Sequence, residues 1–221
     1  MKPTRLLDRS TTPDGTPITL HEHDGTMSIR VAGVELMSTR QHHSEERLAE
    51  LACAGLGERT RATVLIGGLG LGFTLRETLR HVVADATVVV AELVPAVIAW
   101  NRRPEYRLAS DVIDDPRVEI ITGDVADVLA GSRGRFDSIM LDVDNGPSGL
   151  TAAANDALYL GTGLGAARAA LRPGGRLAVW SAGADRRFMA RMETAGFAVE
   201  VVKARTHPTG GSWNSIYIGT R

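Results

Sequence analysis

The chain has 221 residues, of which 43% are hydrophobic and 23% charged, and its formal net charge is -1. This composition is that of a globular protein with one large domain or a core domain with a small appendage. A net charge near zero gives no general reason to expect a nucleic acid or an anionic membrane as partner. Cys53 is the only cysteine, which excludes an internal disulfide and favours a reducing compartment.

No apolar run approaches the roughly 20 residues that a membrane-spanning helix needs. The polar start of the chain has no apolar stretch long enough for a secretory signal. We therefore expect a cytoplasmic protein.

The first 40 residues differ in texture from the rest. Residues 1–16 are polar and rich in Pro, Thr and Asp, and we expect them to be frayed. Residues 17–33 contain two alternating runs on either side of Asp24-Gly25, a strong signal for a two-residue hairpin turn. We expect residues 1–40 to form a tail and a small β-hairpin region.

The larger domain, 41–221, opens with a helix over 44–57, for which Ser44 is the expected cap. Strand-like and helix-like segments then alternate. Strands are predicted at 62–67, 86–93, 117–123, 136–143 and 175–182, with helices at 72–83, 95–103, 124–130, 155–171 and 185–195. Two final strands, 197–205 and 211–219, are predicted to form an antiparallel hairpin. The alternation predicts an α/β fold with a doubly wound, Rossmann-like, mostly parallel seven-stranded sheet, which binds ligands at the carboxyl ends of its strands.

A glycine-rich stretch, "VLIGGLGLGFTLRE" (64–77), spans the turn after the first strand of this sheet. Gly68, Gly70 and Gly72 permit positive φ and remove Cβ atoms that would block a ligand. The stretch contains no G-x-G-x-x-G, the spacing of dinucleotide folds. It better suits a nucleoside that carries an amino-acid tail and no phosphate, although a structural tight turn without a ligand remains an alternative.

Acidic residues follow the next three strands of the predicted sheet. Glu92 ends the second strand, where a carboxylate can accept from both ribose hydroxyls. Asp124 precedes a helix after the third strand, where it could accept from an adenine amino group while the N–H of Val125 faces a ring nitrogen. Asp142 and Asp144 end the fourth strand and would face the reacting centre. Singly, each could be a solvated acid or an ordinary cap; together, in order, they indicate a nucleoside site.

These motifs resemble those of the spermidine synthase family, a branch of the class I S-adenosylmethionine-dependent methyltransferase fold, over roughly residues 36–221. The similar segments are "EERLAEL", "VLIGGLGLGFTLRE", "VVVAEL", "TGDVADVL", "FDSIMLDVDNGP" and "HPTGGSWNSIYIG". The resemblance implies S-adenosylmethionine or its decarboxylated form as cofactor, a small-molecule acceptor and a homodimer. It implies cofactor binding by Gly68, Gly70, Gly72, Glu92, Leu93, Asp124, Val125 and Asp142, catalysis by Asp142 and Asp144, and substrate binding by Asn145 and Trp213.

The departures from the family pattern affect the groups that hold amines. The acid of the family's glycine loop is absent from Leu69-Gly70-Leu71, the family's second acid falls on Asn145, and its helix Tyr falls on Ser44. We therefore predict methyl transfer from S-adenosylmethionine to an amine or hydroxyl of a small molecule. Aminopropyl transfer from the decarboxylated nucleoside is the first alternative, and a non-catalytic nucleoside-binding module is the second.

Other candidate sites are weaker. His21, His23, His42 and His43 lie early in the chain, but no further ligands complete a metal set, and we predict no metal. Arg76 is a candidate partner for the carboxylate of S-adenosylmethionine, together with backbone N–H groups of the helix that follows the glycine loop.

Overall fold

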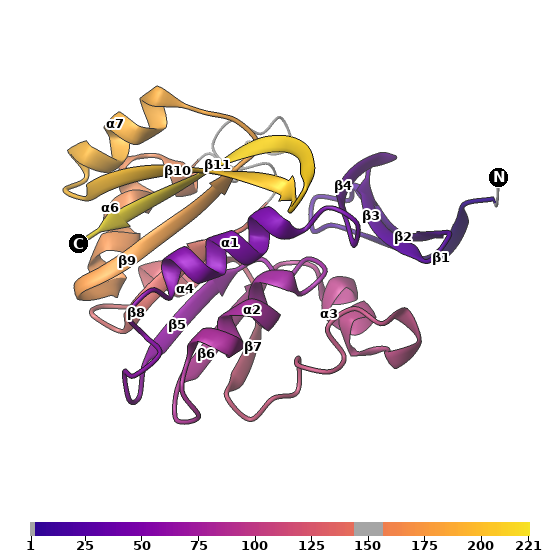
Figure 1. Ribbon diagram of the computed structural model, residues 1–221, viewed down its shortest axis with the longest axis horizontal. Coiled ribbons are helices and arrows are strands. Elements are labelled where there is room, and N and C mark those ends of the chain that lie inside the picture. The colour runs from indigo at the N-terminus through magenta and orange to yellow at the C-terminus, as the bar shows by residue number, and fades with distance from the viewer. Residues whose placement is uncertain (1–2, 144–156) are drawn as a thin grey trace.

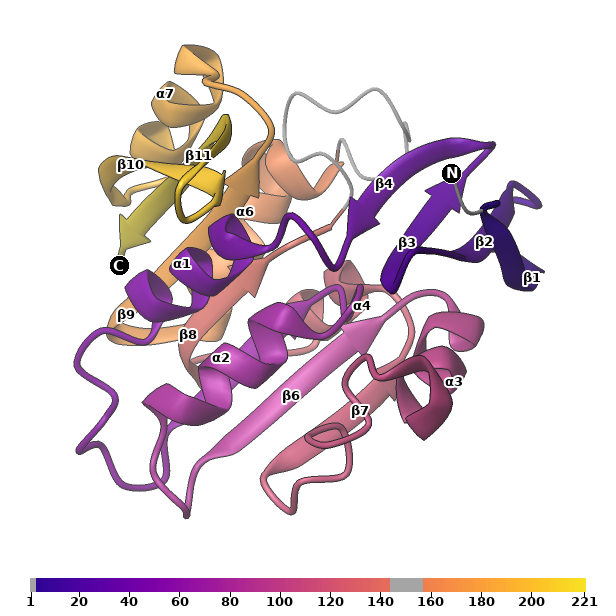
Figure 2. The same cartoon turned by 45° about the vertical axis from the view of Figure 1, so that its right-hand side comes forward.

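The computed structural model describes residues 3–143 and 157–221. Asp144 and Asn145, two of the predicted site residues, lie outside the described residues. The described chain forms a small antiparallel sheet of four strands beside a seven-stranded sheet that is covered by helices (Figures 1 and 2). None of its helices is long and apolar enough to cross a membrane.

The small sheet has the order β1-β2-β3-β4. Its strands are β1 (Arg5–Thr11), β2 (Pro17–His23), β3 (Thr26–Val31) and β4 (Val34–Ser38). The predicted hairpin is confirmed: β2 pairs with β3, and Asp24 and Gly25 both have positive φ, 49° and 80°, as a type I′ turn requires. The expectation that residues 1–16 are frayed is wrong, because β1 pairs with β2 from Arg5 to Thr11.

The large sheet has the order β10-β11-β9-β8-β5-β6-β7. Its strands are β5 (Thr63–Gly67), β6 (Thr87–Glu92), β7 (Val118–Thr122), β8 (Phe136–Leu141), β9 (Leu171–Ser181), β10 (Ala198–His207) and β11 (Gly210–Thr220). Strands β5 to β9 are mutually parallel, and β11 pairs antiparallel with both β9 and β10. The predicted seven-stranded sheet with a terminal hairpin is thus confirmed.

Helices cover both faces of the large sheet (Figure 2). They are α1 (His43–Ala52), α2 (Phe73–His81), α3 (Pro95–Arg102), α4 (Val125–Ala130), α6 (Gly161–Ala170) and α7 (Arg186–Thr194), with short turns η1 (Pro104–Tyr106) and η3 (Ala157–Tyr159). Within β5, Val64 and Ile66 pack on the side of α1, α2 and α3, while Leu65 packs on the side of α4, α6 and α7. Burial on both faces explains why this strand is apolar throughout.

The start of α1 differs from the prediction. Its N-cap is His42, which makes no side-chain capping bond, and Ser44 lies inside the first turn. The Ser44 hydroxyl instead donates to Glu45 Oε2 at 2.6 Å and accepts from Asn214 Nδ2 of β11 at 3.1 Å. The Ser44 hydroxyl, which the sequence predicts as the helix cap, therefore makes a tertiary contact with β11 and does not cap α1.

Candidate functional site

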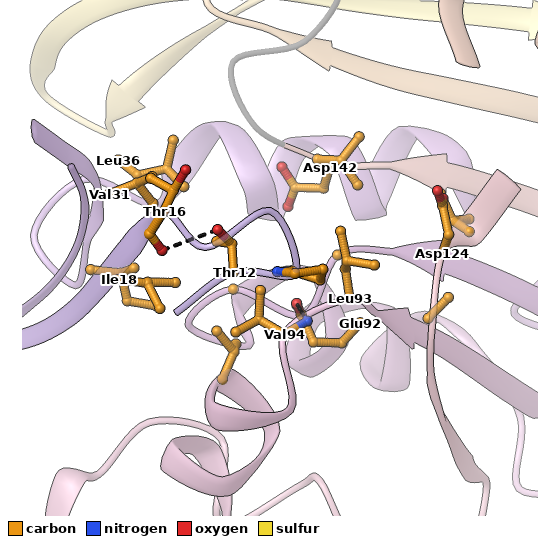
Figure 3. A pocket seen from close by; sticks show the side chains of 18 of the residues that line it. Thr12, Thr16, Ile18, Val31, Leu36, Glu92, Leu93, Val94, Asp124 and Asp142 are labelled. Carbon is orange, nitrogen blue, oxygen red and sulfur yellow. Dashed lines mark hydrogen bonds between the residues drawn. The ribbon is translucent and has the colours of Figure 1, made fainter. Parts of the chain in front are cut away.

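A cavity of about 260 Å³ lies between the small sheet and the carboxyl ends of β5, β6, β7 and β8 (Figure 3). The small sheet and the loop between β1 and β2 contribute one wall, which includes Thr12 of that loop, Ile18 of β2 and Met37 of β4. The other walls contain Gly68, Gly70, Glu92, Leu93, Asp124, Val125 and Asp142, all predicted as site residues. The structure therefore brings together, at one edge of the sheet, predicted site residues that lie up to 74 positions apart in the sequence, from Gly68 to Asp142.

The glycines of the loop have three different roles. All have positive φ: 91° at Gly68, 52° at Gly70 and 83° at Gly72. A Cβ on Gly68 would overlap the carbonyl oxygen of Asp142, so the loop and the end of β8 pack backbone to backbone. A Cβ on Gly70 would lie 2.8 Å from Met37 Sδ, and Gly70 lines the cavity.

Gly72 packs against a neighbouring segment of the chain. It is the N-cap of α2 and lies outside the described cavity lining, and a Cβ there would overlap the side chain of Ala109. The structure therefore gives Gly72 a packing function, and its predicted close approach to a ligand stays a prediction.

Gly70→Val is expected to weaken nucleoside binding at least tenfold, roughly, because a branched side chain would need positive φ and would crowd Met37 at the cavity wall. Calorimetric titration with 5′-methylthioadenosine measures the loss. The double variant Gly70→Ala, Met37→Ala separates crowding from backbone strain, because it removes the crowding only. A folded Gly70→Val protein with unchanged affinity would show that this loop is not a wall of the binding site.

Glu92 connects β6 to the glycine loop. Its Oε2 accepts from the Leu69 N–H at 2.9 Å, and its Oε1 accepts from the Val94 N–H at 2.8 Å. Burial raises the pKa of Glu92, while these backbone hydrogen bonds lower it. Each carboxylate oxygen has a second lone pair, and Glu92 lines the cavity. The carboxylate can therefore accept a hydrogen bond from a ribose hydroxyl while it keeps its bonds to the backbone of the loop.

The β7 side of the cavity combines apolar surface with a carboxylate. Asp124 caps α4 by accepting from the Ala126 N–H at 2.8 Å, so the capping role is present, and Asp124 also lines the cavity beside Val125. Leu93 is 43% exposed and presents apolar surface to the same space. Apolar walls with a few polar groups are typical of small-molecule pockets.

Asp142 lies where the cavity continues past Gly70. Its Oδ2 accepts from the Thr74 hydroxyl of α2 at 2.6 Å. Burial raises the pKa of Asp142 to about 6, and the bond from Thr74 lowers it. At neutral pH a carboxylate with this pKa is ionised and can still take a proton, as a general base must.

A second cavity of about 30 Å³ adjoins the first and shares Met37, Gly70 and Asp142 with it. Its lining includes a carboxylate that the prediction missed, Glu45 of α1. Burial, followed by the nearby charge of Asp142, raises the pKa of Glu45 to about 8. The position of Glu45 could have been predicted from the helical pattern. Glu45 precedes the buried Leu48 and Ala49 by three and four positions, which places its carboxylate on the inner face of the helix.

Trp213 and Arg76 lie away from both described cavity linings. Trp213 is 52% exposed on the β10–β11 hairpin, with the guanidinium of Arg205 4.4 Å from its ring centroid. Arg76 donates to the carboxylate of Asp111 at 2.6 Å and to the carbonyl of Leu108. The substrate contact of Trp213 and the cofactor contact of Arg76 therefore stay predictions, and neither residue is among those that line the two cavities.

The early histidines form local contacts. The ring of His42 stacks on Phe73 with centroids 4.0 Å apart, and His21 Nε2 lies 3.0 Å from the Thr19 hydroxyl. Among the described residues, no group of three or more His, Cys, Asp or Glu side chains is placed to hold a metal ion.

No protein-family model matches the chain. It is 29% identical over 191 residues to polyamine aminopropyltransferase 1 of Streptomyces coelicolor, a match that covers 83% of this chain and 34% of that protein. It is 32% identical over 126 residues to polyamine aminopropyltransferase 2 of Pseudomonas aeruginosa, covering 55% and 34%. Putrescine N-methyltransferase 4 of Nicotiana tabacum is 39% identical over 80 residues, covering 36% and 20%. The chain thus spans about a third or less of the length of these relatives.

Solved structures match over nearly the whole chain. The spermidine synthase of Thermotoga maritima superposes with a TM-score of 0.77 at 20% identity, covering 98% of this chain and 72% of that one. A probable spermidine synthase of Corynebacterium glutamicum gives 0.67 at 16% identity, covering 100% and 81%. The strand order and these likenesses show that the chain has the Rossmann-like fold of spermidine synthases. In sequence, the chain is similar to polyamine aminopropyltransferases over part of their length.

Proposed function

We propose that the protein is an aminopropyltransferase, which moves the aminopropyl group of decarboxylated S-adenosylmethionine to a small amine. This activity is the first alternative of the sequence analysis, and it replaces the methyl transfer that the sequence analysis predicted. The names of the relatives support it, since two of those described are polyamine aminopropyltransferases and one is a putrescine N-methyltransferase. A structure of spermidine synthase with the transition-state analogue AdoDATO, with a TM-score of 0.75 at 20% identity, shares the fold.

The observation that carries the proposal is the charge of the cavity walls. The charged side chains among the described lining residues of the two cavities are all acidic: Asp14, Glu45, Glu92, Asp124 and Asp142. The sequence of residues 144–156, outside the described ranges, also contains no Lys, Arg or His. S-adenosylmethionine carries a carboxylate and its decarboxylated form does not, so acidic walls favour the decarboxylated donor.

The order of the strands gives the donor an orientation. Asp124 follows β7, Glu92 ends β6, and Gly68 and Asp142 follow β5 and β8, which is the spatial order β7-β6-β5-β8. An adenine near Asp124 and a ribose at Glu92 place the sulfonium beside Gly68 and Asp142. The reacting carbon then lies next to the Asp142 carboxylate at the end of β8.

The chemistry needs little beyond alignment and a base. The nitrogen of a neutral amine attacks the aminopropyl carbon bonded to sulfur, forming an N–C bond. The C–S bond breaks with its electron pair going to sulfur, which releases 5′-methylthioadenosine. The Asp142 carboxylate accepts the proton that the new ammonium loses.

The predicted homodimer and cytoplasmic location remain predictions.

The proposal is tested by incubating purified protein with putrescine, or with the monoamine propylamine, and either form of the donor. Mass spectrometry is expected to detect 5′-methylthioadenosine and the aminopropylated amine from the decarboxylated donor. S-adenosylhomocysteine formed from S-adenosylmethionine would instead establish methyl transfer. Nucleoside binding with no product from either donor would identify a non-catalytic binding module.

A further inference from the structure

The smaller cavity lies where a chain attached to the sulfur must go. With the sulfonium beside Gly68 and Asp142, the aminopropyl chain continues past Gly70 along the glycine loop. The cavity there is lined by Leu69, Gly70, Leu71, Phe73 and Thr74, with Met37, Glu45 and Asp142 completing it. Its walls are therefore apolar, as suits three methylene groups, except for the Thr74 hydroxyl and two carboxylates.

Glu45 is fixed in this cavity by a buried chain of hydrogen bonds. Asn214, 4% exposed, donates to the Ser44 hydroxyl, and Ser44, 1% exposed, donates to Glu45 Oε2. These residues belong to β11 and to the first turn of α1, so the position of the carboxylate depends on the packing of α1 against the terminal hairpin. The arrangement orients Glu45 before any ligand binds.

The charges around Glu45 leave it suited to a cationic ligand. Asp142 and Glu46 are the charged groups whose fields reach it, and Glu46 lies within 3.5 Å of the imidazole nitrogens of His42 and His43. The remaining residues of the cavity lining are uncharged. Two carboxylates that face a common apolar space repel each other, and an ammonium placed between them removes that repulsion.

We propose that Glu45 is the donor-specificity residue: its carboxylate binds, together with Asp142, the terminal ammonium of the aminopropyl chain, and the acidic pair offers no positive partner to the carboxylate of S-adenosylmethionine. The inference rests on the proposed function and extends it. It assigns to α1 the negative charge that the glycine loop, with Leu69 and Leu71, does not supply.

The test compares three nucleosides by calorimetric titration: decarboxylated S-adenosylmethionine, S-adenosylmethionine and 5′-methylthioadenosine, which lacks the aminopropyl chain. Glu45→Gln is expected to weaken the decarboxylated donor roughly 10–100-fold, because a charge-assisted contact is lost. Binding of 5′-methylthioadenosine is expected to change less than about twofold. The matched control is Glu50→Gln, in the same helix, whose exposed side chain pairs with Arg47, and it should behave as wild type.

Proton release provides a second measurement that needs only the wild-type protein. Because burial and the charge of Asp142 keep a proton on Glu45 at pH 7, binding of the ammonium should expel that proton. Titrations in buffers of different ionisation enthalpy should show the release with the decarboxylated donor and not with 5′-methylthioadenosine.

The outcomes separate this inference from the proposed function. If the wild-type protein prefers the decarboxylated donor and the Glu45→Gln variant keeps that preference, the inference about Glu45 is overturned and the proposed function stands. Equal losses for all three nucleosides would give Glu45 only a structural role and also overturn it. Wild-type protein that shows no preference for the decarboxylated donor overturns the inference and the proposed function together.

Discussion

Asp142→Asn is expected to lower kcat for aminopropyl transfer by about 10²–10⁴-fold, the usual contribution of a positioned general base. An asparagine amide keeps the shape of the side chain and can still accept from the Thr74 hydroxyl, but it cannot take a proton from the acceptor amine. Steady-state kinetics measure the loss, and binding of 5′-methylthioadenosine, which carries no aminopropyl chain, should remain close to wild type. A variant with normal kcat would remove Asp142 from the role of base.

The pH profile identifies the same group. The base acts when deprotonated, so wild-type kcat should rise as the pH increases through about 6, the pKa to which burial raises Asp142. The Thr74 hydroxyl lowers this pKa, so Thr74→Val should move the acidic limb to higher pH.

Much of the site could be predicted because parallel strands end at one edge of a sheet. Once β5, β6, β7 and β8 were recognised as buried parallel strands, the residues after each of them had to lie close together. Gly68, Glu92, Asp124 and Asp142 line one cavity for this reason. The positions of these four residues follow from the strand pattern and the sheet topology alone, because they do not depend on how one helix packs against another.

The contribution of the small sheet could not be obtained in this way. β1 has polar and apolar residues without a clear alternation, and its pairing with β2 over Arg5–Thr11 includes a register shift between Leu6 and Asp8. The position of the small sheet over the cavity depends on contacts between segments that are distant in sequence. The wall that includes Thr12, Ile18 and Met37 was therefore missed.

Glu45 shows how a missing acid can mislead. The glycine loop has Leu69 and Leu71 and no acid, and this absence favoured methyl transfer in the sequence analysis. A carboxylate from α1 lies in the cavity beside those leucines. Its distance from the loop in sequence, 24 residues from Glu45 to Leu69, gave no reason to connect them. A charge requirement belongs to a cavity, and any element that lines the cavity can supply it.

Glu92→Gln is expected to weaken nucleoside binding by tenfold or more, roughly, and to destabilise the fold by about 1–3 kcal/mol. Both effects share a cause: the glutamate accepts from the Leu69 and Val94 N–H groups, and an amide NH₂ in place of one oxygen leaves one of these buried donors without an acceptor. Chemical denaturation measures the second effect. Glu119→Gln is the matched control, since Glu119 lies on the neighbouring β7 with an exposed side chain that pairs with Arg135.

Loss of affinity in Glu92→Gln would not by itself show a contact with ribose, because a displaced glycine loop would weaken binding as well. A double-mutant cycle with the ligand resolves this. Wild-type protein should bind 5′-methylthioadenosine about 10-fold or more tightly than its 2′-deoxy analogue, since a hydroxyl donating to a buried carboxylate is lost. In Glu92→Gln that ratio should fall toward one. If the ratio is the same in both proteins, Glu92 only holds the loop in place, and the ribose hydroxyl is bound by another group in the cavity.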